Sequence, residues 1–273
     1  MSYLSVTAKT MQSKHDLMPE RRSFLWHLAT ACAAAAPLGL ARAQTRLIRV
    51  AAASDLKFAL TDLGARFEQD TSHKLAITYG SSGNLARQLE QGLPMDLFLS
   101  ADEALVFRLA KNGWARDGGV VYGLGRLAWL LPAGSAAVIT GDLKGLVAAL
   151  GEGGKLSIAN PEHAPYGRAA RSALQTAKLW PELQNRLVLG ENVSQATQFV
   201  STGAAQVGLV ALSLAIAPEV AQRTRHGVVD AALHPPIIQR MALHASASVS
   251  AQRFYAYLQT SSAQKILSGH GLR

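Results

Sequence analysis

The sequence predicts an α/β fold made of two lobes, and three observations support this. From residue 44 onward, short apolar or β-branched runs alternate with segments of helical periodicity, which is typical of parallel sheets with helices on both faces. The alternation is interrupted by a run at residues 120–131, where Gly123 and Gly125 indicate a bend that carries the chain into a second lobe. A chain of 273 residues that is 49% hydrophobic can bury a sizeable core, as two domains of ordinary size or one large one.

The same alternation gives the individual elements. Because open α/β sheets bind ligands outside the carboxyl ends of their strands, two facing lobes would place those ends around a cleft. The predicted strands are residues 47–53, 74–79, 96–100, 156–159, 186–189, 207–212 and 237–243. The predicted helices are residues 55–69, 83–91, 103–112, 167–179, 194–202 and 248–267. The last strand and the last helix follow His234-Pro235-Pro236, a segment that interrupts regular secondary structure.

The domain organisation follows because we expect the chain to cross from one lobe to the other twice. We expect the first lobe to consist of residues 44–124 plus 239–273, and the second lobe of residues 125–238.

Residues 1–43 are predicted to be an export signal rather than part of either lobe. Arg21-Arg22 precede an alanine-rich apolar run that is too short to span a membrane, and Ala41-Arg42-Ala43 forms a small-x-small cleavage site. We expect a twin-arginine signal peptide cut after Ala43, and a mature periplasmic protein that begins at Gln44.

The only cysteine, Cys32, lies inside this segment. The mature chain would then have no thiol for a disulfide, a thiolate metal site or nucleophilic catalysis. Acylation of Cys32, as in a lipoprotein, is the alternative, although Ala29-Thr30-Ala31 is a poor match to the residues that precede an acylated cysteine.

The charge pattern disfavours a nucleic-acid surface. The leader carries +3 of the net charge of +9 and leaves +6 on the mature chain, where the basic residues are scattered without interleaved aromatic residues. This positive charge would either attract small anions to the protein or serve only to keep the protein soluble.

Serines occur where predicted strands run into helices. Ser54 follows the first strand, Ser81 and Ser82 follow the second, and Ser100 ends the third, where we interpret it as a structural cap near Asp102. The first backbone N–H groups of a helix have no partner within it, so hydroxyl groups and amides can converge there on an anion without a cation.

The mature chain resembles the periplasmic molybdate-binding proteins, the solute receptors of ABC importers. The resemblance is carried by an ordered set of motifs that spans nearly all of residues 49–271 and implies a type II periplasmic-binding-protein fold with the ligand between the lobes. These motifs are VAAASDLKFAL, YGSSGNLARQLEQGLPMDLFLSAD, IANPEHAPYGRAA, GENVSQATQFVSTGAAQVGLVALS and RFYAYLQTSSAQKILSGHG.

The resemblance also implies a set of ligand-binding residues. Ser54 and Ser82 would donate hydroxyl and backbone hydrogen bonds from the first lobe, with the amide of Asp55 as a further donor and Ser81 as second choice to Ser82. Tyr166 and the amide of Val193 would contribute from the second lobe. One branch of the family has a ligand tyrosine where this chain has Ala211, and we expect Tyr166 to replace that donor from another direction.

A pocket made only of donors matches a fully deprotonated tetrahedral dianion such as molybdate or tungstate, which offers only acceptors. The alternatives are sulfate and phosphate; a protonated phosphate would leave its proton facing another donor. An Asp55 carboxylate that pointed inward would favour phosphate, but a helix N-terminus alone explains an acid here, so we expect its side chain to point outward.

Other classes of function find less support. Gly80-Ser81-Ser82-Gly83 lacks the spacing of a nucleophile elbow, and His163 is interpreted as solvated surface, so we do not expect an enzyme. The histidines show no metal-ligand spacing, and we expect neither a cofactor nor a bound metal cation. A ligand-sensing module of a regulator could share the fold, but the export signal favours a monomeric receptor whose partners are a membrane permease and its ATPase.

Overall fold

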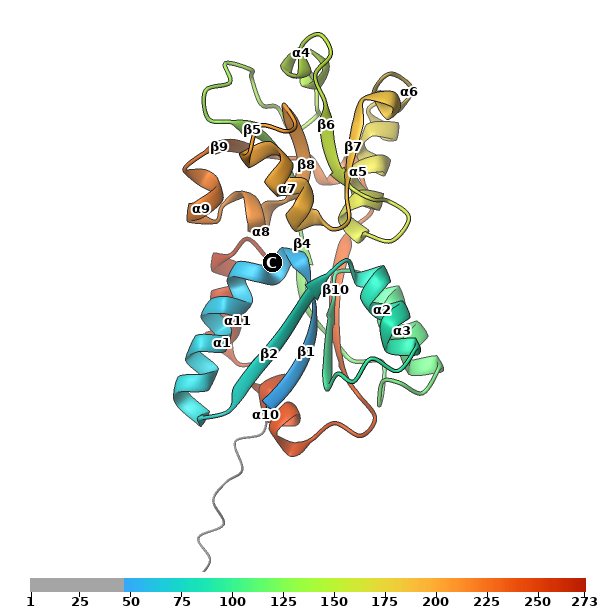
Figure 1. Cartoon of the computed structure of the whole chain (residues 1–273), viewed down its shortest axis with the longest axis vertical. Helices are drawn as coiled ribbons and strands as arrows, with labels where there is room; N and C mark the ends of the chain where they lie inside the picture. The colour runs from blue at the N-terminus through green and yellow to red at the C-terminus, as the bar shows by residue number, and fades with distance from the viewer. Residues whose placement is uncertain (1–46) are drawn as a thin grey trace, which may run out of the picture. The chain divides into compact units, whose positions relative to one another are not determined.

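Two five-stranded sheets organise residues 47–273, the part of the chain that the computed structural model describes. The predicted export signal at residues 1–43, including Cys32, lies outside the described residues. In Figure 1 the elements of the first sheet occupy the lower part of the view and those of the second sheet the upper part. We call each sheet with its helices a lobe.

The first sheet has the strand order β2-β1-β3-β10-β4. β1 pairs in parallel with β2 and β3, whereas β10 is antiparallel to both β3 and β4, so β10 runs opposite to the other strands. Its strands are β1 (Leu47–Ala53), β2 (Lys74–Gly80), β3 (Leu97–Ser100), β4 (Val120–Gly125) and β10 (Ile237–Leu243).

The second sheet repeats this plan in the order β7-β6-β8-β5-β9. β6 pairs in parallel with β7 and β8, and β5 is antiparallel to β8 and β9. Its strands are β5 (Leu127–Pro132), β6 (Leu156–Ala159), β7 (Leu187–Gly190), β8 (Val207–Ala211) and β9 (Thr224–Val228).

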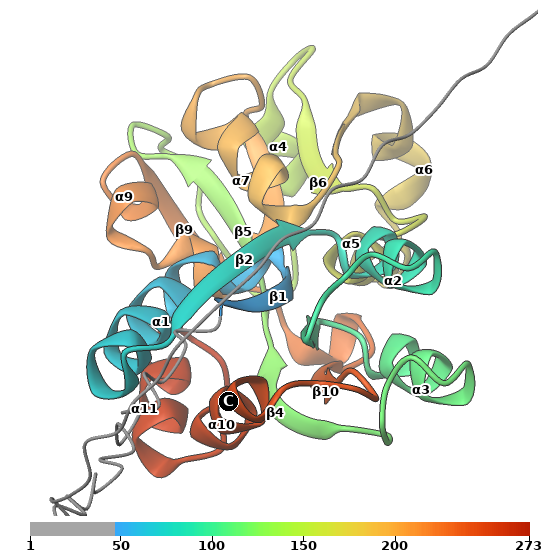
Figure 2. The same ribbon diagram turned by 60° about the horizontal axis from the view of Figure 1, so that its bottom comes forward.

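Helices cover both faces of the first sheet. Along β1, Ile48 and Val50 pack into one apolar cluster with Phe254, while Ala51 packs into another with Phe98, because successive side chains of a strand point to opposite faces. Figure 2 shows α1, α10 and α11 together on one side and α2 and α3 on the other. The helical segments of this lobe are η1 (Ser54–Leu56), α1 (Lys57–Thr71), α2 (Ser82–Glu90), α3 (Glu103–Lys111), α10 (Val249–Tyr257) and α11 (Ser261–Gly269).

The second lobe has its own core, in which Trp129 of β5 is fully buried. Its helical segments are α4 (Leu146–Leu150), α5 (Pro165–Thr176), α6 (Trp180–Leu183), η2 (Gln184–Arg186), α7 (Val193–Ser201), α8 (Leu212–Ala215), α9 (Pro218–Ala221) and η3 (Ala231–Leu233).

The predicted two-lobe α/β fold is confirmed, and the strands predicted at residues 47–53, 156–159 and 237–243 have the observed bounds. The run at 120–131 divides at Arg126 into β4 and β5, which belong to different sheets. The single helix predicted at 248–267 is wrong, because the Thr260 hydroxyl accepts a hydrogen bond from the Ala263 amide and begins a new helix.

Candidate ligand-binding site

The six candidate residues lie together between the lobes. All six are buried and line one small cavity of about 10 Å³. That is about the space of a single water-sized sphere, so the lobes are in close contact around these side chains. The cavity is lined by Ala53, Ser54, Asp55, Gly80, Ser81, Ser82, Ala101, Ala164, Pro165, Tyr166 and Val193.

The topology explains why residues far apart in the sequence meet here. In the first lobe the parallel strands β1, β2 and β3 end at the same edge, and η1 and α2 begin there. In the second lobe the parallel strands β6 and β7 likewise lead to the first residues of α5 and α7. Helix N-termini from both lobes therefore point their free N–H groups and positive dipole ends at the cavity.

The hydroxyls of Ser54 and Ser82 are placed as hydrogen-bond donors. Ser82 Oγ accepts from the amide of Ala101 at 3.0 Å, and Ser54 Oγ accepts from the amide of Ser194, in the other lobe, at 3.3 Å. Within residues 47–273 neither hydroxyl donates its proton to an acceptor of the protein. Since a serine hydroxyl carries one proton in addition to its lone pairs, each can donate to a molecule in the cavity.

The amide of Val193 is the corresponding donor from the second lobe. Asn192 caps α7, and its side-chain oxygen accepts from the amides of Ser194 and Gln195. Val193 is the first residue of this helix, so its own N–H has no partner inside the helix and remains for a ligand.

The expectation that Asp55 points outward is wrong. Its side chain is 1% exposed, and Oδ2 accepts hydrogen bonds from the Tyr166 hydroxyl at 3.0 Å and from Gln239 Nε2 at 2.6 Å. Burial raises the pKa of Asp55 to about 6, although the hydrogen bonds from Gln239 and Tyr166 lower it. The sequence argument failed because it considered only the helix dipole and not the residues contributed by the other elements.

Tyr166 is committed to this carboxylate in the described structure. Its hydroxyl donates to Asp55 and accepts from Gln239 Nε2 at 3.1 Å, and burial raises the pKa of the phenol well above its usual range. A methyl group at Gly125 would lie 2.4 Å from this hydroxyl, so a glycine leaves room for it. Ala211 ends β8 with a buried side chain that supplies no polar group.

Sequence reasoning missed Gln239, which lies in the middle of β10 and is fully buried. The available signal was a side-chain amide in a strand whose residues are apolar except for Gln239 and Arg240, since a buried amide requires partners.

His163 is not solvated surface, as the sequence suggested, but a contact between the lobes. Its Nδ1 lies 2.8 Å from Ser81 Oγ, its carbonyl accepts from the Gly83 amide at 3.0 Å, and its Nε2 lies 3.6 Å from Glu191 Oε2. A methyl group at Gly83 would lie 2.4 Å from the His163 carbonyl oxygen, so the close approach of the lobes requires glycine there. Ser81 is thereby partnered, which leaves Ser82 as the freer hydroxyl of the pair.

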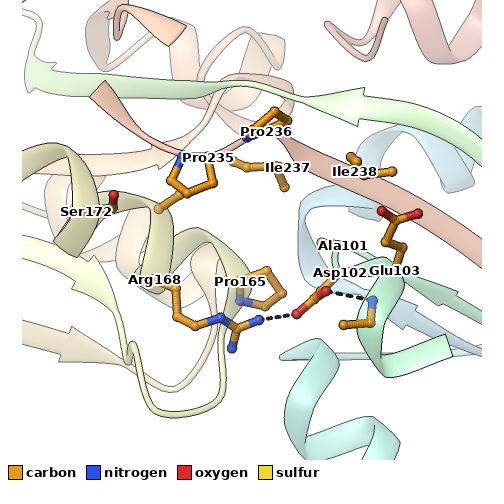
Figure 3. A pocket seen from close by; sticks show the side chains of 12 residues that line it. Ala101, Asp102, Glu103, Pro165, Arg168, Ser172, Pro235, Pro236, Ile237 and Ile238 are labelled. Carbon is orange, nitrogen blue, oxygen red and sulfur yellow. Dashed lines mark hydrogen bonds and ion pairs between the residues drawn. The ribbon is translucent and has the colours of Figure 1, made fainter. Parts of the chain in front are cut away.

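A larger groove of about 380 Å³ opens beside the cavity and shares Ala101 and Pro165 with it. Figure 3 shows Arg168 of α5 reaching across to Asp102, which also caps α3 through the Ala104 amide. The rest of the wall is mainly apolar, with three prolines and two isoleucines, and it includes the carboxylate residue Glu103. Because its arginine is already paired with a carboxylate, the groove suits an anion less well than the small cavity does.

Residues 47–273 contain neither a membrane-spanning helix nor a cluster of metal-binding side chains. No helix within residues 47–273 is both long and apolar enough to cross a bilayer. In the same residues no three His, Cys, Asp or Glu side chains come together as a metal site would require.

Two α/β lobes that bring helix N-termini and hydroxyls to a shared buried cavity define a solute-binding protein. The chain belongs to the family of bacterial extracellular solute-binding proteins, whose pattern matches residues 48–273. Membership of this family assigns the chain to solute binding rather than to catalysis, and the solute is a ligand rather than a cofactor.

Similar proteins narrow the resemblance within this family. The molybdate-binding protein ModA of Rhodobacter capsulatus is 33% identical over 251 residues, which cover 89% of this chain and 94% of that protein. ModA of Escherichia coli (strain K12) is 32% identical over 256 residues, with coverage of 92% and 98%. The structure of the Azotobacter vinelandii periplasmic molybdate-binding protein matches with a TM-score of 0.75 and 30% identity, over 83% of this chain and 98% of that one. The resemblance drawn from the sequence motifs is therefore confirmed.

Proposed function

We propose that this protein is a periplasmic receptor that captures molybdate, and also tungstate, for an ABC importer. The observation that carries the proposal is the set of donors at the interlobe cavity: the free hydroxyl protons of Ser54 and Ser82 and the amide of Val193. Tetrahedral dianions without protons offer only acceptors and match such donors.

The ligand would bind by closing the lobes. We propose that the first lobe, predicted as residues 44–124 plus 239–273, moves against the second lobe, predicted as residues 125–238, although Gly125, Ile237 and Ile238 pair within the first sheet. One of the two crossings of the chain between the lobes is the break between β4 and β5 at Arg126. A ligand that contacts both lobes favours the closed arrangement over the open one. The closed, monomeric receptor would then be recognised by a membrane permease with its ATPase, after export by the N-terminal signal.

The alternative ligands are the tetrahedral oxyanions phosphate and sulfate, and one observation favours phosphate. The Asp55 carboxyl group is buried at the cavity, where an ionised carboxylate would accept the proton of hydrogen phosphate and repel molybdate or sulfate. The two ModA proteins of Rhodobacter capsulatus and Escherichia coli, which match about nine-tenths of this chain, are named molybdate-binding proteins, so molybdate is the ligand we propose.

Calorimetric titration of Gln44–Arg273 with molybdate, tungstate, sulfate and phosphate tests this assignment. We expect tight binding of molybdate and tungstate, and weak or no binding of the other two. Preferential binding of phosphate or sulfate would keep the receptor function and reject the ligand. An absence of binding by all four would favour the sensing alternative.

A further inference from the structure

Only one of the two carboxyl oxygens of Asp55 has hydrogen-bond partners within residues 47–273. Its two side-chain donors in that part of the chain, Tyr166 and Gln239, both bond to Oδ2. Oδ1 is buried and has no hydrogen-bond partner within residues 47–273, and Asp55 lines the same cavity as Ser54 and Ser82. An unpaired buried carboxylate oxygen is costly, so this atom is suited to a partner that arrives from outside the protein.

Among residues 47–273, the groups that face Asp55 provide no cation to compensate its charge. α7 and α8, which pack against η1, contain no titratable residue, and Lys57 at the start of α1 is exposed. α5 contributes the neutral phenol of Tyr166, and β4 contributes Tyr122. Burial of the Tyr122 ring, together with the nearby Asp55, raises the pKa of its phenol.

Three other ionisable side chains near the site have partners of their own. Arg168, on α5, pairs with Asp102. Arg240, on β10, pairs with Glu103 at 3.0 Å. His163, before α5, contacts Ser81 at the other side of the cavity. Burial therefore dominates the environment of Asp55 and raises its pKa to about 6.

A fully deprotonated oxyanion in this cavity would meet one acceptor among donors. If Oδ1 were ionised, the anion would face a like charge in a poorly solvated place. If Oδ1 carried a proton, the same atom would become a donor and the cavity would consist of donors alone. We propose that Asp55 takes up one proton from solution when such an oxyanion binds and donates it from Oδ1 to the anion. This inference rests on the proposed function.

One O–H bond forms on the Asp55 carboxyl group, the bond that held this proton in the buffer acid breaks, and no other covalent bond changes. The ionised carboxylate, one proton from the buffer and the dianion combine into a neutral carboxylic acid that is hydrogen-bonded to the dianion. Hydrogen phosphate would bring its own proton and donate it to the carboxylate, so its binding would take no proton from the buffer. Proton uptake thus distinguishes the two classes of oxyanion at the same residue.

The experiment is titration with sodium molybdate at about pH 7.5 in several buffers of different ionisation enthalpy. The slope of the observed enthalpy against that of the buffer counts the protons taken up. We expect close to one proton for the natural chain and none for Asp55→Asn, whose amide is a permanently neutral donor. The affinity of the natural chain should weaken about fiftyfold from pH 6 to pH 8, because only the protonated fraction binds, while that of Asp55→Asn stays flat.

His163→Asn is the matched control, since it removes the imidazole that contacts Ser81 in the cavity wall and keeps an amide beside Ser81. This variant should retain the uptake of one proton. Binding of molybdate without proton uptake by the natural chain would overturn the inference, and so would loss of the uptake in His163→Asn. If neither the natural chain nor Asp55→Asn binds molybdate at any pH tested, the proposed function fails together with this inference.

Discussion

The hydroxyl of Tyr166 lies 3.0 Å from Oδ2 of Asp55, and this hydrogen bond joins the first turn of α5 in one lobe to the turn after β1 in the other. Gln239 donates to both residues from β10, at 2.6 Å to the carboxylate and 3.1 Å to the phenol. This polar contact between the lobes is therefore built around a single buried carboxyl group, and the properties of the site depend on the charge of that group.

Replacement of Ser82 by alanine should weaken oxyanion binding about ten- to a hundredfold, because a hydrogen bond to a charged ligand contributes roughly 1.5–3 kcal/mol. Calorimetric titration with molybdate measures the change. Ser157→Ala is the matched control: this serine is also buried, and its hydroxyl donates to the Ala196 carbonyl at 2.9 Å inside the second lobe. Unchanged affinity in folded Ser82→Ala protein would remove Ser82 from the site.

Replacement of Tyr166 by phenylalanine should lower the affinity about tenfold, because the closed arrangement loses a hydrogen bond between the lobes. Tyr122→Phe serves for comparison, since its buried hydroxyl bonds to the Ser100 carbonyl within the first lobe. The two variants should differ in affinity even if they lose similar thermal stability. Equal affinities would show that the Tyr166 hydroxyl has no role in closure or binding.

Replacement of Gly83 by alanine separates closure from folding. The added methyl group would lie 2.4 Å from the His163 carbonyl oxygen across the lobe boundary, whereas inside α2 alanine is the better helix former. We expect the thermal midpoint without ligand to stay the same or rise, and the affinity to fall by about tenfold or more. Gly134→Ala, where a methyl group meets nothing within 4 Å, should leave the affinity unchanged. Normal binding by Gly83→Ala would mean that the lobes need not approach this closely.

The charge of Asp55 should also affect stability in a defined pH window. Its folded pKa of about 6 exceeds the ordinary value of 3.8, so its contribution favours the folded state below about pH 4 and is lost as the pH rises through 6. Asp55→Asn should therefore raise the free energy of unfolding at pH 7 by up to about 3 kcal/mol and give no such gain near pH 4. Denaturant unfolding of the ligand-free protein at the two pH values measures this difference. A gain of the same size at both would assign the effect to packing rather than to charge.

Much of the site geometry could be predicted because it depends on topology. Ser54 and Ser82 each follow a strand of one parallel sheet, so their meeting at one edge follows from the alternation of strands and helices. Val193 meets them from the second lobe in the same way, at the start of a helix after a parallel strand.

The parts that could not be predicted depend on side-chain packing between distant segments. Gln239 approaches Asp55 from 184 residues away, on a strand whose direction and neighbours the local pattern does not specify. The burial of His163 likewise depends on how closely the lobes approach, which no local signal records. β9 was missed because its sequence, TRHGV, lacks the apolar alternation of a typical strand.

The most direct test of the central claim is a crystal structure of Gln44–Arg273 with tungstate, whose heavy atom can be located by its anomalous scattering. Our account predicts one strong peak between the lobes, with oxygens at hydrogen-bond distance from Ser54 Oγ, Ser82 Oγ and the Val193 amide. A peak elsewhere, for example in the groove beside Arg168, would contradict the proposed site even if the anion bound tightly in solution.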